Sequence, residues 1–123
     1  MYDKALALEI LQRLHQTTET ILTRFAPVKS VQGFTSSPAG MEKLDSICML
    51  LIAIGEGLKN LDKVTAGALL PGYPQIDWKR AKGLRDIISH QYFNVDAEEI
   101  FHICTTYIEI MRNALRQIIE ELR

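Results

Sequence analysis

Apolar residues recur at intervals of three and four positions along most of the chain, which is the spacing of one face of an α-helix. Over residues 3–25 this repeat predicts an amphipathic helix. Residues 26–40 are rich in Pro, Gly and Ser and predict a loop long enough to cross the end of a helical bundle. We expect this loop to be the most mobile region of the protein.

A second helix is predicted to start at Ser37 and Pro38, which suit the N-cap and the first helical position. The turn formers in residues 71–74 are expected to stop it. Its middle, residues 47–54, is apolar on every side, which a surface helix does not tolerate. We therefore expect this segment to lie between partners or in a subunit contact, and we favour a dimer contact.

Two further helices follow. Asp77 is a favourable N-cap for a short third helix that should end near His90. Asp96 and Glu99 have the spacing of a capping box and open a last helix. The residues expected to face inward are Trp78, Ala81, Leu84, Ile87 and Ile88 in the third helix, and Ile100, Ile103, Tyr107, Ile110, Met111, Ala114, Leu115, Ile118 and Leu122 in the last.

No segment alternates between apolar and polar residues as a half-buried strand does. The four predicted helices, joined by one long and two short connections, indicate an all-α protein, an antiparallel four-helix bundle. With 123 residues, of which 47% are apolar and 24% charged, the chain can form one core. We expect a single domain over residues 1–123.

Composition excludes several classes of protein. A net charge of -1 means that any site for a polyanion must be local. The longest apolar run, residues 47–55, is far short of the roughly 20 residues of a membrane span, and the chain does not start like a secreted protein. The two cysteines, Cys48 and Cys104, form no CxxC motif and are expected in the core. A cytoplasmic protein without membrane contact is the simplest prediction.

Most familiar catalytic signatures are missing, and residues 55–57 (GEG) lack the third glycine of a phosphate-binding turn. Positive charge is instead concentrated in residues 79–85, at Lys79, Arg80, Lys82 and Arg85. This cluster runs directly into Asp86 and His90. The alternative interpretation of such a cluster is a solvated helix face.

Arg85 and His90 are five residues apart, about 140° around a regular helix, so they do not share a face. They can still converge, because arginine is long, His90 lies where the helix should end, and a two-fold axis would add a second copy of each. Asp86 and His90 are four residues apart and share a face, where a carboxylate can fix the imidazole tautomer. Such a histidine suits general acid or base catalysis.

Residues 85–92 read RDIISHQY and resemble the R-x4-H-x-Y motif of HEPN-domain ribonuclease toxins of the HepT kind. The similarity extends over most of the chain: residues 54–56 (IGE), Trp78 before the motif, and YF-x-VD at residues 92–96 fall where that family has them. The loop at residues 27–40 shows no such similarity. Gly57 departs from the family, which more often has alanine there, so local helix stability is in question.

The resemblance implies a homodimeric, HEPN-like four-helix bundle in which the motifs of both subunits line a shared cleft. It implies RNA cleavage without a metal ion or other cofactor. His90 would act as acid or base on the ribose 2'-hydroxyl or the leaving oxygen, Arg85 would stabilise charge on the scissile phosphate, and Asp86 would orient the site.

In this family the toxin's partner is a small MNT-type nucleotidyltransferase antitoxin that adds AMP to the motif tyrosine, here Tyr92. An added phosphate would neutralise the neighbouring arginine and block the substrate. The remaining cations of the cluster would attract the RNA backbone: Lys79, Arg80 and Lys82.

Two other functions remain open at this point. One is a non-catalytic subunit that binds a nucleotide or other substrate for a partner nucleotidyltransferase, and the other is a plain helical interaction protein. In the last case Arg85 and Asp86 are a solvated charge pair, His90 caps a helix and Tyr92 packs between helices. The pattern leaves the position of Glu56 undecided, whereas the two other histidines, His15 and His102, have no comparable neighbours.

Overall fold

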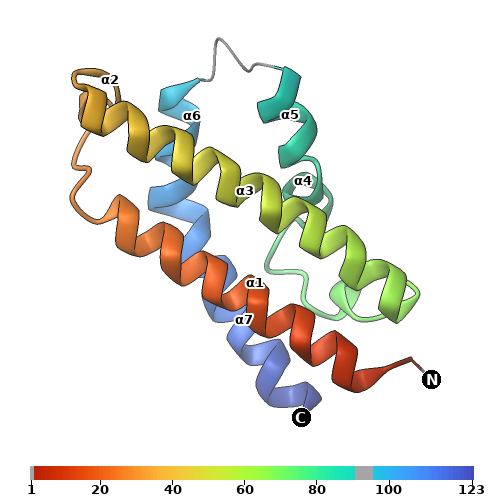
Figure 1. Cartoon of the computed structure of the whole chain (residues 1–123). Helices are drawn as coiled ribbons and strands as arrows, with labels where there is room; N and C mark the ends of the chain where they lie inside the picture. Colours follow the sequence, from red (N-terminus) through yellow and green to blue (C-terminus); the bar gives the residue numbers. More distant parts are fainter. Residues whose placement is uncertain (1, 91–95) are drawn as a thin grey trace.

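The computed structural model describes residues 2–90 and 96–123, and within these residues the regular structure is entirely helical. Helix α1 (Lys4–Phe25) packs against both α3 (Pro38–Thr65) and α7 (Ile108–Leu122). Two short helices, α4 (Trp78–Lys82) and α5 (Leu84–His90), pack on α3. Figure 1 shows α1 and α3 side by side and running in opposite directions. The prediction of an all-α protein is confirmed.

Helix α1 agrees with the prediction. The Asp3 side chain accepts a hydrogen bond of 3.0 Å from the backbone N–H of Leu6, which caps the first turn. The helix buries one apolar stripe, as its pattern indicates: Ala7, Ile10, Leu11, Leu14, Ile21 and Phe25.

The segment predicted as a mobile loop contains a short helix, α2 (Gln32–Thr35). Its Phe34 is completely buried, with its ring centroid 5.9 Å from that of Phe25 and 6.4 Å from that of Phe101. The prediction of a loop is therefore wrong over Gln32–Thr35, where the buried Phe34 ring packs the connection against the core, and the expected mobility stays a prediction.

Helix α3 begins as predicted, since the Ser37 side chain accepts a 3.0 Å hydrogen bond from the Gly40 N–H. Its end differs from the prediction. Ala66 and Gly67 have φ values of 52° and 71°, and this left-handed turn ends the helix at Thr65. The prolines of residues 71–74 come later, after the chain has already turned, so they do not stop the helix.

The predicted third helix is broken. Asp77 caps its start by accepting a 3.0 Å hydrogen bond from the Arg80 N–H, but Gly83 separates α4 from α5. Glycine is among the weakest helix formers, and the preceding cations repel one another along the short helix. Ile87, which was expected to face inward, is 38% exposed.

The last helix contains a widened turn. Asp96 caps α6 (Ala97–His102), which leads into the π-helical turn η2 (Ile103–Tyr107) and then into α7. The wider turn changes the phase of the apolar stripe. Ile108 is fully buried, whereas Tyr107 and Ile110, both predicted to face the core, are 39% and 44% exposed.

The middle of α3 is only partly covered within the described residues. Ile47, Leu51 and Ile54 are fully buried in the core, but Met49 is 72% exposed. The dimer contact predicted for this segment thus stays a prediction, with an apolar side chain available for it.

Both cysteines lie in the core, as predicted. Burial raises the pKa of Cys48 to about 11, with a further contribution from Asp45, and burial raises the pKa of Cys104 to about 12. Neither thiol is therefore a nucleophile near neutral pH. Among the described residues, no helix combines the length and the apolar character needed to cross a lipid bilayer.

Candidate functional site

Arg85 lies on the first turn of α5 and reaches across to α3. Its Nε atom is 3.3 Å from Oε1 of Glu56. The sequence left the position of Glu56 undecided. Within this chain, Glu56 is the carboxylate beside the motif arginine. The same Oε1 lies 4.0 Å from Nζ of Lys59, one turn further along α3.

Gly55 explains how the two helices come so close. A Cβ atom at this position would lie 3.3 Å from the carbonyl oxygens of both Ala81 and Lys82, which is tighter than ordinary packing. The absence of a side chain lets the backbone of the α4–α5 junction rest directly on α3. This contact determines which residue of α3 stands opposite Arg85.

The ion pair between Arg85 and Glu56 is exposed, with 55% and 49% of the two side chains accessible to solvent. Exposed pairs of this kind contribute about 0–1 kcal/mol to stability. Glu56 can therefore orient the guanidinium, and the pair is weak enough for the guanidinium to leave Glu56 and bind a phosphate.

The four predicted cations do not share one surface. Lys82 forms an ion pair with Asp62 of α3, and it lines a shallow groove together with Lys79. Arg80 points elsewhere, with its guanidinium carbon 5.7 Å from the centre of the Tyr107 ring. The cluster in the sequence thus divides between two sides of α4.

The groove beside α4 also includes Asp86, so this residue lies close to the cations. Three ammonium groups and two carboxylates line it, which leaves a local excess of positive charge. The full lining is Lys59, Asp62, Lys79, Lys82, Gly83 and Asp86.

His90 is the last residue of α5, as predicted, but its side chain lies outside the described residues, as does Tyr92 altogether. The structure places Arg85 next to Glu56, and Asp86 on the groove. Convergence of Arg85 and His90 remains a prediction.

Sequence reasoning left the position of Glu56 undecided and did not assign Lys59 or Asp62 to the site. Glu56, Lys59 and Asp62 recur at intervals of three and share a helix face, so the sequence contained the signal for a polar stripe on α3. It did not contain the identity of the helix that faces this stripe.

The fold and the site together define an all-helical domain. In it, a short helix that carries an arginine and ends in a histidine packs against a polar stripe on the longest helix. A family profile described as "Ribonuclease HepT-like" matches residues 8–118 of this chain. The chain therefore belongs to the HepT-like ribonuclease family, and the resemblance inferred from the motif is confirmed.

Two proteins of Methanocaldococcus jannaschii are similar to this chain. "Putative RNase MJ0127" is 32% identical over 72 residues, which are 58% of this chain and 56% of that protein. "Putative RNase MJ0125" is 30% identical over 77 residues, which are 63% of each. The chain thus matches less than two thirds of the length of either relative. No solved structure matches it significantly.

Proposed function

We propose that this protein is an endoribonuclease that cleaves RNA without a metal ion. The observation that carries the proposal is the Arg85 side chain of the family motif, which is 55% exposed and has its Nε atom 3.3 Å from Oε1 of Glu56. A guanidinium presented in this way can bind two oxygens of a phosphodiester.

RNA carries its own nucleophile, so the protein needs to move protons and stabilise charge. In the proposed reaction the ribose 2'-oxygen attacks phosphorus and loses its proton to a base. The bond to the 5'-oxygen breaks, and that oxygen takes up a proton. His90 serves as base or acid in these transfers, Arg85 stabilises the charge on the phosphoryl oxygens, and Asp86 orients the site. The products are a 2',3'-cyclic phosphate and a 5'-hydroxyl.

The test is incubation of the purified protein with RNA in EDTA, followed by analysis of the fragment ends. Cleavage that leaves 2',3'-cyclic phosphates supports the proposal. Tight nucleotide binding without cleavage would favour the second candidate, a substrate-binding subunit of a nucleotidyltransferase. Absence of both activities would leave an interaction protein.

Glu56 acts in this proposal as a positioning residue for Arg85. In Glu56→Gln we expect kcat to fall about 10-fold, because the arginine loses its fixed direction, which costs part of the usual gain from orientation. The same change removes a negative charge near the substrate, so non-cleavable 2'-O-methyl RNA should bind about 2- to 5-fold more tightly. Steady-state kinetics and fluorescence anisotropy measure the two effects separately.

The matched control for this prediction is Glu9→Gln. Glu9 forms a more exposed ion pair with an arginine, Arg13, on α1 at 2.9 Å, far along the chain from the motif. Its loss should change neither kcat nor RNA affinity. Equal behaviour of the two variants would show that Glu56 has no positioning role.

The active form is proposed to be a homodimer whose two motifs line one cleft. The exposed Met49 on α3 and Ile87 on α5 are apolar side chains that such a contact would cover. Ile87 lies close to Arg85 along α5, so a dimer contact that covers Ile87 would lie beside the proposed site.

The biological role is proposed to be that of a toxin kept inactive in the cytoplasm by an MNT-type nucleotidyltransferase antitoxin. AMP addition to Tyr92 would place a phosphate near Arg85 and His90, neutralise the arginine and obstruct the substrate's path. A neighbouring reading frame with a G-S-x-n-D-x-D signature would support this role.

A further inference from the structure

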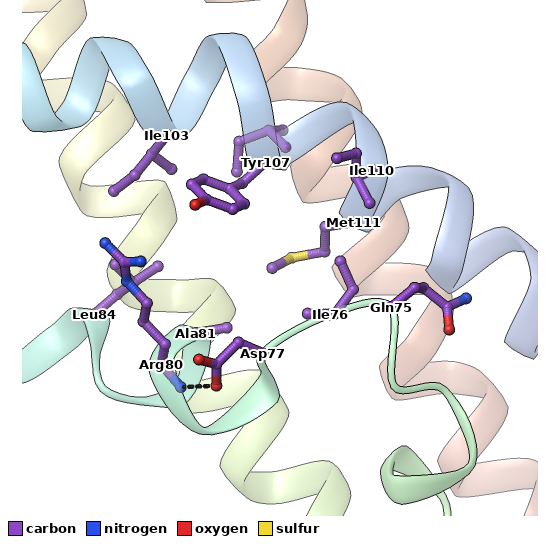
Figure 2. A pocket seen from close by; sticks show the side chains of 11 residues that line it. Gln75, Ile76, Asp77, Arg80, Ala81, Leu84, Ile103, Tyr107, Ile110 and Met111 are labelled. Atoms are coloured by element: carbon purple, nitrogen blue, oxygen red, sulfur yellow. Dashed lines mark hydrogen bonds between the residues drawn. The ribbon is translucent and has the colours of Figure 1, made fainter.

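A cavity lies on the side of α4 that faces away from the shallow groove, between the loop before α4 and the π-helical turn. Figure 2 shows the ring of Tyr107 and the side chain of Arg80 on one side of it, with Gln75 and Asp77 on the preceding loop. Its remaining walls are mostly apolar: Ile76, Ala81, Leu84, Ile103, Ile108, Ile110 and Met111. The proposed function assigns no role to this cavity.

We propose that this cavity binds a single pyrimidine base of single-stranded RNA and so selects where the chain cleaves. The inference rests on the proposed ribonuclease function and adds a specificity site to it. An exposed aromatic ring, apolar walls and a few polar groups at the rim are the means by which proteins hold an unstacked base.

The π-helical turn makes Tyr107 available for this role. A regular helix would keep its ring in the core, but the wider turn leaves it 39% exposed at the mouth of the cavity. The ring is held at one side by His102, whose centroid is 5.6 Å away in an edge-to-face arrangement. Tyr107 is therefore an oriented platform on which a base can stack.

Charge favours a nucleotide over an apolar protein side chain as the occupant. Arg80 lies over the Tyr107 ring and lines the cavity. A base that enters the cavity brings its phosphates toward this guanidinium. Asp77, the one carboxylate of the lining, already accepts a hydrogen bond from the Arg80 N–H and lies at the rim with Gln75.

The size of the cavity favours a pyrimidine. It measures about 80 Å³, whereas a cavity that encloses a whole benzene molecule measures about 150 Å³. It can therefore take the edge of one six-membered ring and leave the sugar outside. A purine would leave much of its double ring uncovered. Met111, a flexible side chain in the wall, allows small adjustments of shape.

The cavity also adjoins the motif helix. Leu84, the residue before Arg85, lines it. Leu84 and Ile103 also line a second, smaller cavity that runs under α5 along Ile87 and Ile88. A nucleotide held at Tyr107 would therefore lie on the path along α5 to the proposed cleavage site.

The experiment compares binding of 2'-O-methyl oligouridine, oligocytidine and oligoadenosine to the full chain, because 2'-O-methyl RNA cannot be cleaved. Fluorescence anisotropy of labelled oligonucleotides measures affinity. Tyr107→Ala should weaken pyrimidine binding by about 5- to 100-fold, the usual contribution of one stacked base. It should also abolish the preference over oligoadenosine.

Tyr107→Phe keeps the ring and should retain both affinity and preference. Ile110→Ala, a change at an exposed wall of the cavity, provides a second variant should Tyr107→Ala fold poorly, and it should weaken the preference as well. Leu6→Ala removes an exposed apolar side chain on α1, away from the cavity, and should leave base preference unchanged.

A uniform loss of affinity for all three oligonucleotides in Tyr107→Ala, or no loss at all, would overturn the inference. So would unchanged RNA binding with a changed oligomeric mass, which would identify the cavity as a protein contact. If the wild-type protein cleaves RNA while Tyr107→Ala keeps its base preference, only this inference fails. If the wild-type protein neither binds nor cleaves RNA, the proposed function fails first.

Discussion

Arg85→Ala is expected to lower kcat/KM for RNA cleavage by about 100- to 1,000-fold, the usual cost of removing one charge-stabilising group from a catalytic site. His90→Ala should cost about 100- to 10,000-fold, because it removes the proposed proton-transfer group. Arg85 is more than half exposed and its ion pair is weak, so its removal should change the free energy of unfolding by less than about 1 kcal/mol. Cleavage assays in EDTA and urea denaturation measure the two effects.

Two variants on α1 serve as controls. Arg13→Ala removes an exposed, ion-paired arginine, and His15→Gln removes a histidine outside the motif. Both should cleave RNA at the wild-type rate. If Arg85→Ala and His90→Ala both cleave RNA at the wild-type rate, the assignment of these residues to the site is wrong, and the cleavage has another source.

Gly55→Val is expected to affect stability and activity together. The added side chain would meet the carbonyl oxygens of Ala81 and Lys82, where even a Cβ atom lies at 3.3 Å, so α4 and α5 must move away from α3. Such overpacking costs about 1–3 kcal/mol. The displacement would also separate Arg85 from Glu56, and cleavage should fall even at temperatures where the variant remains folded.

The control for this prediction is Gly72→Ala. No heavy atom lies within 4 Å of the position that its Cβ would occupy, and its φ is not in the left-handed region. Its free energy of unfolding should stay within about 0.5 kcal/mol of the wild type. A Gly55→Val protein as stable and active as Gly72→Ala would show that close contact at the α4–α5 junction does not matter.

The helix boundaries illustrate which local signals are reliable. Caps at Ser37, Asp77 and Asp96 were predictable, because a side chain that accepts a hydrogen bond from the following turn acts over three or four residues. The end of α3 was misplaced, since alanine at position 66 adopts a left-handed conformation that its residue type does not favour.

Gly83 and the π-helical turn η2 cause larger differences between the predicted and the observed helices. Gly83 divides a predicted helix, and η2 moves Tyr107 and Ile110 out of the core stripe. A period of 3.6 residues is a property of regular helices, so a widened turn can displace individual side chains from the predicted stripe. Further along α7 the inward predictions are confirmed at Met111, Ala114, Leu115 and Ile118. The cavity described above is lined by two residues of this turn, Ile103 and Tyr107.

By itself the sequence determined the helical class of the protein, the caps that begin its helices, the family motif and the cationic segment before it, because each depends on neighbours within a few positions along the chain. Tertiary structure decided that Glu56 stands opposite Arg85, that Arg80 and Lys82 face different surfaces, and that Tyr107 opens a cavity. These features arise where α3, α4 and η2 meet. No local sequence pattern encodes the packing between segments that are distant along the chain.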